Sequence, residues 1–144
     1  MSEARSEFLL VQTGSRPVGL LLRDVIEVGD IGEVFAVPST APAMRGVMAS
    51  RGRLVPVLHL DALLTARACP AGMAPVGVLA DLGGIRICLE VESADVVTRE
   101  TLHPVPPGES LPWALAVVRR EDGLIPILNL GALRERLLDA ETRA

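Results

Sequence analysis

The sequence predicts an all-β protein made of two similar small barrels, and three observations support this. Short apolar runs are separated by glycine, proline and charged residues, a pattern typical of short strands joined by turns. The chain also repeats itself, because residues 52–64 (GRLVPVLHLDALL) are similar to residues 123–133 (GLIPILNLGAL), and at a shift of 70 positions Pro56 corresponds to Pro126. A proline cannot donate to a ladder, so the same proline in both repeats indicates a shared bend, at an edge or a bulge. Ten short strands in two sets of five would form two small barrels.

A weaker echo extends the repeat upstream. Residues 20–28 (LLLRDVIEV) are similar to residues 89–97 (LEVESADVV) at a shift of 69 positions. We therefore assign one barrel to roughly residues 7–70 and the other to roughly 74–130, within a single domain over residues 6–140. Each half alone would have only a marginal core at about 70 residues, so we expect the halves to pack intimately and share one core.

The first half divides into five predicted strands around a proline-interrupted crossing. They cover residues 8–13, 18–28, 34–37, 47–50 and 54–60. Charged residues at Arg23 and Asp24 break the outer part of the long second strand. The last two strands flank Arg51-Gly52-Arg53, a hairpin with Gly52 at its tip. Two helical turns are predicted over residues 61–68.

The second half contains predicted strands at residues 76–82, 85–91, 113–118 and 124–130. Residues 85–91 alternate strictly: Ile85, Ile87, Leu89 and Val91 point one way, and the polar residues and Cys88 point the other. This pattern predicts a strand with one buried face and one solvent-exposed face. A loop with four prolines covers residues 103–112, and helical spacing predicts a C-terminal helix over 130–140.

Composition narrows the possible functions. Hydrophobic residues make up 49% and aromatic residues only 2% of the 144, so the core must be aliphatic, with Trp113 expected inside it. The net charge is −4 and lysine is absent, which argues against a nucleic-acid-binding protein. We see no signal sequence and no apolar run long enough to span a membrane, so we expect a cytoplasmic protein without direct membrane insertion.

The chain shows no catalytic, cofactor-binding or metal-binding pattern. Cys69 and Cys88 are expected to be reduced, partly buried thiols. His59 and His103 lie 44 positions apart and no third ligand is visible, so His59 is expected to be a polar residue at a strand edge. No nucleophile has an evident base, and no phosphate-binding loop is present. We therefore expect no enzyme, no cofactor and no metal.

The segment from Pro42 to Leu60 (PAMRGVMASRGRLVPVLHL) resembles the signature of CheW-like domains, the coupling proteins of bacterial chemosensory arrays. In the family, Asn-Leu-Arg-Gly is followed by apolar residues and a proline. Phe8–Val11, Gly19–Val28, Val91-Glu92 and Leu124–Leu130 follow other family motifs in order. The resemblance covers about residues 7–138.

The resemblance implies two five-stranded SH3-like barrels packed side by side, with short helices and a C-terminal helix. It also implies a non-enzymatic adaptor that links a receptor to a kinase in chemotaxis or motility signalling. The partners would be the cytoplasmic tip of a methyl-accepting chemoreceptor, lying in the groove between the barrels, and the regulatory domain of a CheA-type histidine kinase. The adaptor would be recruited to membrane-associated, cytoplasmic or nucleoid receptor clusters.

The resemblance also suggests which residues matter. Candidates for receptor binding are Glu27, Val25, Arg51 and Arg45, although for Arg45 an ordinary solvated side chain is an equal alternative. The residues expected to serve turns and bends are Gly46, Gly52, Pro56 and Pro126.

Several positions depart from the family pattern. Ala49-Ser50 replaces the Asn-Leu before Arg-Gly, His59 replaces an aspartate, and the glycine usual before the last hairpin is replaced within Ala114–Val117. One alternative is therefore a divergent coupler that keeps the receptor and has weakened or lost kinase binding. An alternative of another class, a tandem-barrel nucleic-acid-binding module, is disfavoured by the acidity.

Overall fold

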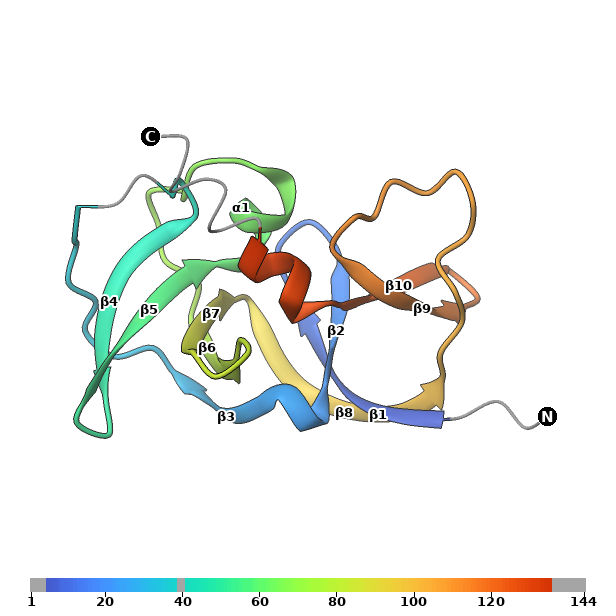
Figure 1. Cartoon of the computed structure of the whole chain (residues 1–144), viewed down its shortest axis with the longest axis horizontal. Coiled ribbons are helices and arrows are strands. Elements are labelled where there is room, and N and C mark those ends of the chain that lie inside the picture. Colours follow the sequence, from blue (N-terminus) through green and yellow to red (C-terminus); the bar gives the residue numbers. More distant parts are fainter. Residues whose placement is uncertain (1–4, 39–40, 136–144) are drawn as a thin grey trace.

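The computed structural model describes residues 5–38 and 41–135, and within them ten strands form two five-stranded sheets (Figure 1). Barrel A has the strand order β8-β1-β2-β10-β9 and barrel B the order β3-β6-β7-β5-β4. The strands of barrel A are β1 (Arg5–Gln12), β2 (Pro17–Leu21), β8 (Ser93–Thr101), β9 (Ala114–Arg120) and β10 (Gly123–Leu128). Those of barrel B are β3 (Val25–Asp30), β4 (Met44–Ser50), β5 (Arg53–His59), β6 (Val76–Asp81) and β7 (Arg86–Val91). The predicted pair of SH3-like barrels is confirmed.

The sequence repeat appears as a repeat of strand pairing. In barrel A the hairpins β1–β2 and β9–β10 meet through a parallel contact between β2 and β10. In barrel B the hairpins β6–β7 and β4–β5 meet through a parallel contact between β7 and β5. A fifth strand, β8 or β3, joins the outer side of β1 or β6. Strands β1 to β5 thus correspond in order to β6 to β10.

The assignment of whole barrels to residues 7–70 and 74–130 is wrong. Barrel A takes two strands from the first half and three from the second, and barrel B takes the reverse. A 3-10 turn at Leu22–Asp24 divides the predicted strand 18–28 and carries the chain into barrel B. Only Glu92 separates β7 from β8, where the chain returns to barrel A. The chain thus crosses between the barrels at these two short connections.

The main apolar core lies between the barrels. Its cluster of buried residues includes Val11 and Leu20 from barrel A and Leu58 and Leu89 from barrel B. Trp113 belongs to the same cluster, as predicted. Because burial of this surface requires both barrels, the expectation of a shared core is confirmed.

Two smaller clusters fill the barrels themselves. Phe8, Leu21, Val118, Ile125 and Ile127 form the cluster in barrel A. Met48, Val55, Val57, Leu79 and Cys88 form the cluster in barrel B. Cys69 is half-buried and Cys88 buried, and both are free thiols.

The prediction that residues 85–91 have one solvent-exposed face is wrong. Strand β7 is buried from Ile87 to Val91, and both Cys88 and Glu90 are inaccessible to solvent. The strand lies between β6 and β5, so one face meets the shared core and the other faces the interior of barrel B. The alternation of apolar and polar residues separated the two faces of the strand correctly, but it did not reveal that the second face is enclosed inside barrel B.

The remaining elements largely follow the predictions. Helix α1 (Leu60–Thr65) confirms the helical turns, and residues 130–135 are helical, while the rest of the predicted C-terminal helix lies outside the described residues. The predicted strand 34–37 is reduced to a bridge between Phe35 and Val47. Strand β8 was not predicted.

The turn and bend residues lie as the repeat requires. Arg51 (φ 51°) and Gly52 (φ 77°) form a two-residue hairpin turn with positive φ at both positions. Gly46 (φ 154°) lies against the backbone carbonyl of Phe35, which leaves no space for a side chain. Pro56 and Pro126 occupy equivalent places, paired with Val47 and Val117.

Neither proline lies on an edge strand, because β5 and β10 both have neighbours on two sides. The parallel pairing of β5 with β7 begins only at Val57, and the recorded pair between β10 and β2 is at Ile127. Each proline therefore stands one residue before the parallel contact, where its missing N–H has no ladder partner to lose.

Candidate functional site

Two of the predicted receptor-binding residues meet on the surface. The Nη2 of Arg51, in the β4–β5 turn, donates to the Oε2 of Glu27, on β3, at 2.8 Å. Both side chains are well exposed, at 67% and 47%. Exposed ion pairs of this kind contribute about 0–1 kcal/mol to stability. The pair is therefore cheap to break, and both charges are open to a partner.

Strand β3 presents apolar side chains next to this ion pair. β3 pairs only with β6, so within the described residues its other edge has no strand partner. Ile26 and Val28 are exposed, whereas Val25 is half-buried against the shared core. A register shift between Val25 and Glu27 leaves Ile26 out of the ladder. Val25 therefore packs against the shared core beneath this surface and contributes little exposed area to it.

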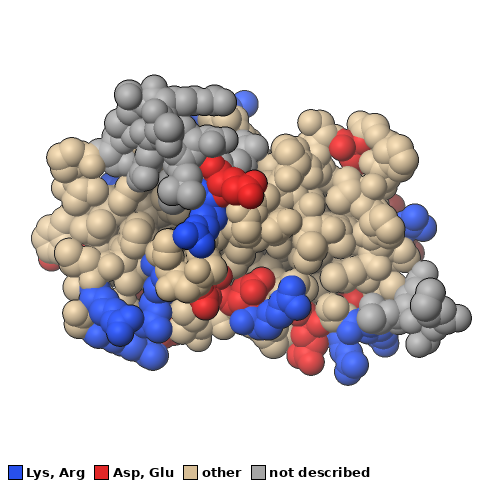
Figure 2. Space-filling view, viewed as in Figure 1, with Lys and Arg blue, Asp and Glu red and all other residues tan. Residues whose placement is uncertain are grey.

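A second exposed apolar strand continues this side of the molecule. β8 pairs only with β1, and its Val96 and Val97 are about half exposed. Figure 1 shows β3 and β8 along the same side, where the two barrels adjoin. Figure 2 shows charges of both signs along that side, while most of the opposite side of barrel A is uncharged. We call the residues Leu22, Ile26, Val28, Val96 and Val97 the junction surface.

Arg45 does not belong to this surface, and the prediction that it faces a partner or solvent is wrong. Its Nε and Nη2 donate to Oε1 and Oε2 of Glu90, each at 2.9 Å. Glu90 is fully buried and the Arg45 side chain is 13% exposed. The hydrogen bond to Glu90 raises the pKa of Arg45 above its ordinary value. Arg45 is a structural residue that neutralises a buried carboxylate.

The same pair fixes the segment before β6. Arg45 also donates to the carbonyls of Pro70 (2.6 Å) and Gly72 (3.0 Å). The backbone N–H of Ala74 donates to Glu90 Oε2 at 2.8 Å. The buried carboxylate therefore has three donors, and two otherwise unpaired carbonyls gain partners. The sequence analysis did not identify Glu90 as a buried ion-pair partner, because the alternation placed its side chain on the face predicted to be solvent-exposed.

His59 also lies inside, not at a strand edge. It precedes helix α1, and its Nδ1 accepts from the N–H of Ala62 at 3.1 Å, so it is the helix N-cap. Asn129 plays the same part in the second repeat, accepting from the N–H of Ala132 at 3.2 Å. The signal was present in the sequence, since His59 and Asn129 align in the repeat.

The described residues contain no group of three or more histidine, cysteine or carboxylate side chains placed to hold a metal ion. Within the same residues, no helix is long and apolar enough to cross a membrane.

Comparison with known proteins identifies the family. The profile of the CheW-like domain family matches residues 7–137. The chain belongs to the CheW-like domain family. Its fold is similar to the crystal structure of the scaffolding protein TtCheW from Thermoanaerobacter tengcongensis, with a TM-score of 0.77 and 20% sequence identity, covering 89% of this chain and 91% of that one. A comparison with curated protein sequences gave no match.

Within this CheW-like domain, the departures from the family pattern lie in different environments. Ala49 is exposed and Ser50 half-buried beside the Arg51 turn, so they alter the surface next to the Glu27–Arg51 pair. His59 is buried and caps α1, so its change cannot alter a partner contact directly. Ala116, the counterpart of Gly46 in the repeat, is buried in β9.

Proposed function

We propose that this protein is a non-enzymatic adaptor that binds the cytoplasmic tip of a chemoreceptor and couples it to a CheA-type histidine kinase. The observation that carries the proposal is the junction surface beside the exposed Glu27–Arg51 pair. Membership of the CheW-like family and the fold shared with a scaffolding protein support it.

The chemistry of the junction surface suits a helical partner. Its exposed apolar side chains come from the edge strands β3 and β8 and from Leu22 in the 3-10 turn, and we infer that the outward-facing ones form a strip along this side of the molecule. An amphipathic helix buries its apolar face in such a strip, and flanking charges set its direction. The weak stabilisation expected from the exposed pair leaves both side chains free to exchange partners.

A pull-down with the receptor tip and the kinase regulatory domain from the same genome tests the proposal. We expect the receptor fragment to be retained, and Val97→Glu to abolish retention, because a carboxylate in the strip would be desolvated without a partner. Glu121→Gln, in the exposed β9–β10 turn, serves as a surface control. If neither fragment is retained by the folded protein, the proposed function is wrong.

A second candidate is a divergent coupler with weak kinase binding. The small, exposed Ala49 favours it, because contact area is lost beside the Arg51 turn. Calorimetric titration of the kinase regulatory domain distinguishes the two. A dissociation constant of about a micromolar or better would identify an ordinary coupler, and no measurable heat would favour the divergent one.

A further inference from the structure

The two barrels differ at one corresponding end. Gly46 pairs with Val57 in barrel B, and Ala116 pairs with Ile127 in barrel A, so the residues before them, Arg45 and Leu115, correspond. In barrel B this end is closed by Arg45, Glu90 and the segment before β6.

The parallel contacts extend this correspondence to the carboxylate. Val57 pairs with Cys88 and Ile127 with Gly19, so two residues further on Glu90 corresponds to Leu21. The ion pair of barrel B is thus replaced by two leucines in barrel A, Leu21 and Leu115.

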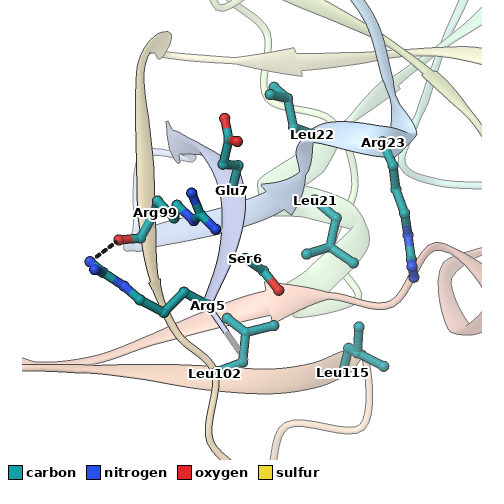
Figure 3. A pocket seen from close by; sticks show the side chains of 9 residues that line it. All are labelled: Arg5, Ser6, Glu7, Leu21, Leu22, Arg23, Arg99, Leu102 and Leu115. Atoms are coloured by element: carbon teal, nitrogen blue, oxygen red, sulfur yellow. Dashed lines mark hydrogen bonds between the residues drawn. The ribbon is translucent and has the colours of Figure 1, made fainter. Parts of the chain in front are cut away.

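At these leucines barrel A has an open pocket of about 450 Å³ (Figure 3). Leu21, Leu22, Leu102 and Leu115 form its apolar lining. Leu21 is buried at its base, and Leu115 is 46% exposed at its mouth. The volume lies in the range of about 300–1,000 Å³ usual for ligand sites.

The rim of the pocket is mainly cationic. Arg5, Arg23 and Arg99 line it, against the single lining carboxylate of Glu7, while Arg23 Nε also lies 3.9 Å from Oδ1 of the neighbouring Asp24. Arg5 donates to the backbone carbonyl of Arg99 at 2.8 Å, which holds both residues at the same edge of the pocket. This local excess of positive charge stands out in a chain whose net charge is −4. A positive rim around an apolar base favours a ligand that inserts an aliphatic group and carries negative charges on either side of it.

We propose that this pocket is a docking site for an acidic peptide segment of a partner protein that inserts an aliphatic side chain between Leu21 and Leu115. Barrel B shows the geometry internally, because there the segment at Pro70–Ala74 runs across the corresponding end and hydrogen-bonds to it. In barrel A the partner's segment would take that place, with its carboxylates on the arginine rim. The site is separate from the junction surface except for Leu22, so the proposal does not depend on receptor binding.

The test is fluorescence anisotropy with a labelled peptide of sequence DEDLLDED, titrated with the full chain. Two control peptides, DEDSSDED and RKRLLRKR, remove the aliphatic anchor and reverse the charge. We expect saturable binding of the first peptide only, with a dissociation constant below about 1 mM that rises with salt.

Protein variants locate the binding. Leu115→Ser removes the aliphatic contact without changing the charge and should weaken binding by about tenfold or more. Arg99→Glu should weaken it several-fold at low salt. Leu54→Ser, at a leucine that is 72% exposed on β5, and Arg119→Glu, at an exposed arginine outside the pocket, are the matched controls and should bind normally.

Circular dichroism confirms that each variant is folded. Equal binding of the serine peptide, unchanged binding by Leu115→Ser, or no saturable binding to the folded protein would overturn the proposal. It would also fall if the peptide bound only after removal of residues 1–4, since the pocket would then serve the chain's own N-terminal segment. Retention of the receptor fragment by Leu115→Ser is measured in parallel, so that failure of the pocket proposal is distinguished from failure of the proposed function.

Discussion

Barrel A and barrel B share one strand-pairing scheme but fill it with different chemistry. In barrel A, Phe8 lies against Gly19, where an added Cβ would lie 2.7 Å from the phenylalanine ring. In barrel B the corresponding positions hold Gly77 and Cys88, and the glycine has moved to the other strand. The pairing scheme therefore tolerates exchange within a contacting pair, provided that the two side chains together keep a volume that fits.

The same rule holds for charge. At one end the pair is Leu21 and Leu115, and at the other it is Glu90 and Arg45. The two leucines carry no charge, and Arg45 neutralises Glu90. A buried charge at one of these positions with a leucine at the other would have no partner of opposite charge. The comparison teaches that residues at the same end of a barrel change together between the two repeats, charged with charged and apolar with apolar.

The largest expected effect comes from breaking the ion pair in barrel B. Arg45→Leu should lower the free energy of unfolding by about 3–5 kcal/mol, because Glu90 stays buried without its neutralising partner. Urea denaturation followed by circular dichroism measures it.

The double variant Arg45→Leu with Glu90→Leu gives barrel B the apolar pair of barrel A. Its free energy of unfolding should be only about 1–3 kcal/mol below that of the native chain, because the hydrogen bonds to Pro70, Gly72 and Ala74 are the interactions that it still lacks. If the double variant is less stable than the single one, the two ends are not interchangeable and the comparison fails.

A second prediction concerns the glycine of barrel A. Gly19→Ala should destabilise the protein by about 1–3 kcal/mol, because its Cβ would lie 2.5 Å from Ile127 Cδ1 and 2.7 Å from the Phe8 ring. Adding Phe8→Leu should restore part of the loss. Gly29→Ala, with open space around its Cβ, is the control. A thermal melt of Gly19→Ala that matches the control would show that the interior of barrel A is looser than described.

The helix caps offer a smaller test of the repeat. His59→Ala removes the acceptor for the Ala62 N–H and should cost about 0.5–2 kcal/mol. His59→Asn introduces the cap used by the second repeat at Asn129 and should cost less. Equal losses for the two variants would mean that His59 contributes through packing and not through capping.

The smallest effect expected near neutral pH concerns the thiols. Burial raises the pKa of Cys88 from 9.0 to about 11, and the nearby Glu90 adds to the shift. A thiol with a raised pKa favours the fold while it is protonated, so this contribution is lost as pH rises from about 9 to 11. At about pH 8 a thiol reagent should modify half-buried Cys69 well before Cys88. Equal rates would show that barrel B opens readily.

The sequence repeat predicted much of the fold, because Pro56 and Pro126 mark the same bend in both halves. It could not predict that the halves exchange strands, since partner choice depends on contacts far apart in the sequence. Strand β8 was not predicted, although residues 89–97 echo residues 20–28; its Val96 and Val97 form only a short apolar run between charged residues.

The candidate site was predicted in part. Glu27 and Arg51 were identified through a family motif, and the structure brings them together. Arg45 was misplaced because its partner Glu90 lies 45 positions away, and alternation in β7 cannot reveal that the second face is enclosed. Leu21 and Leu115 gave no signal, since aliphatic residues in strands normally indicate core.

The central claim is that the exposed Glu27–Arg51 pair and the junction surface bind a receptor tip. Isothermal titration of a receptor hairpin fragment from the same genome tests it most directly, with the native chain, Arg51→Glu and Glu27→Arg. Each single reversal should weaken binding by about tenfold or more while the unfolding free energy changes by no more than about 1 kcal/mol. Native-like affinity of both folded variants would contradict the account.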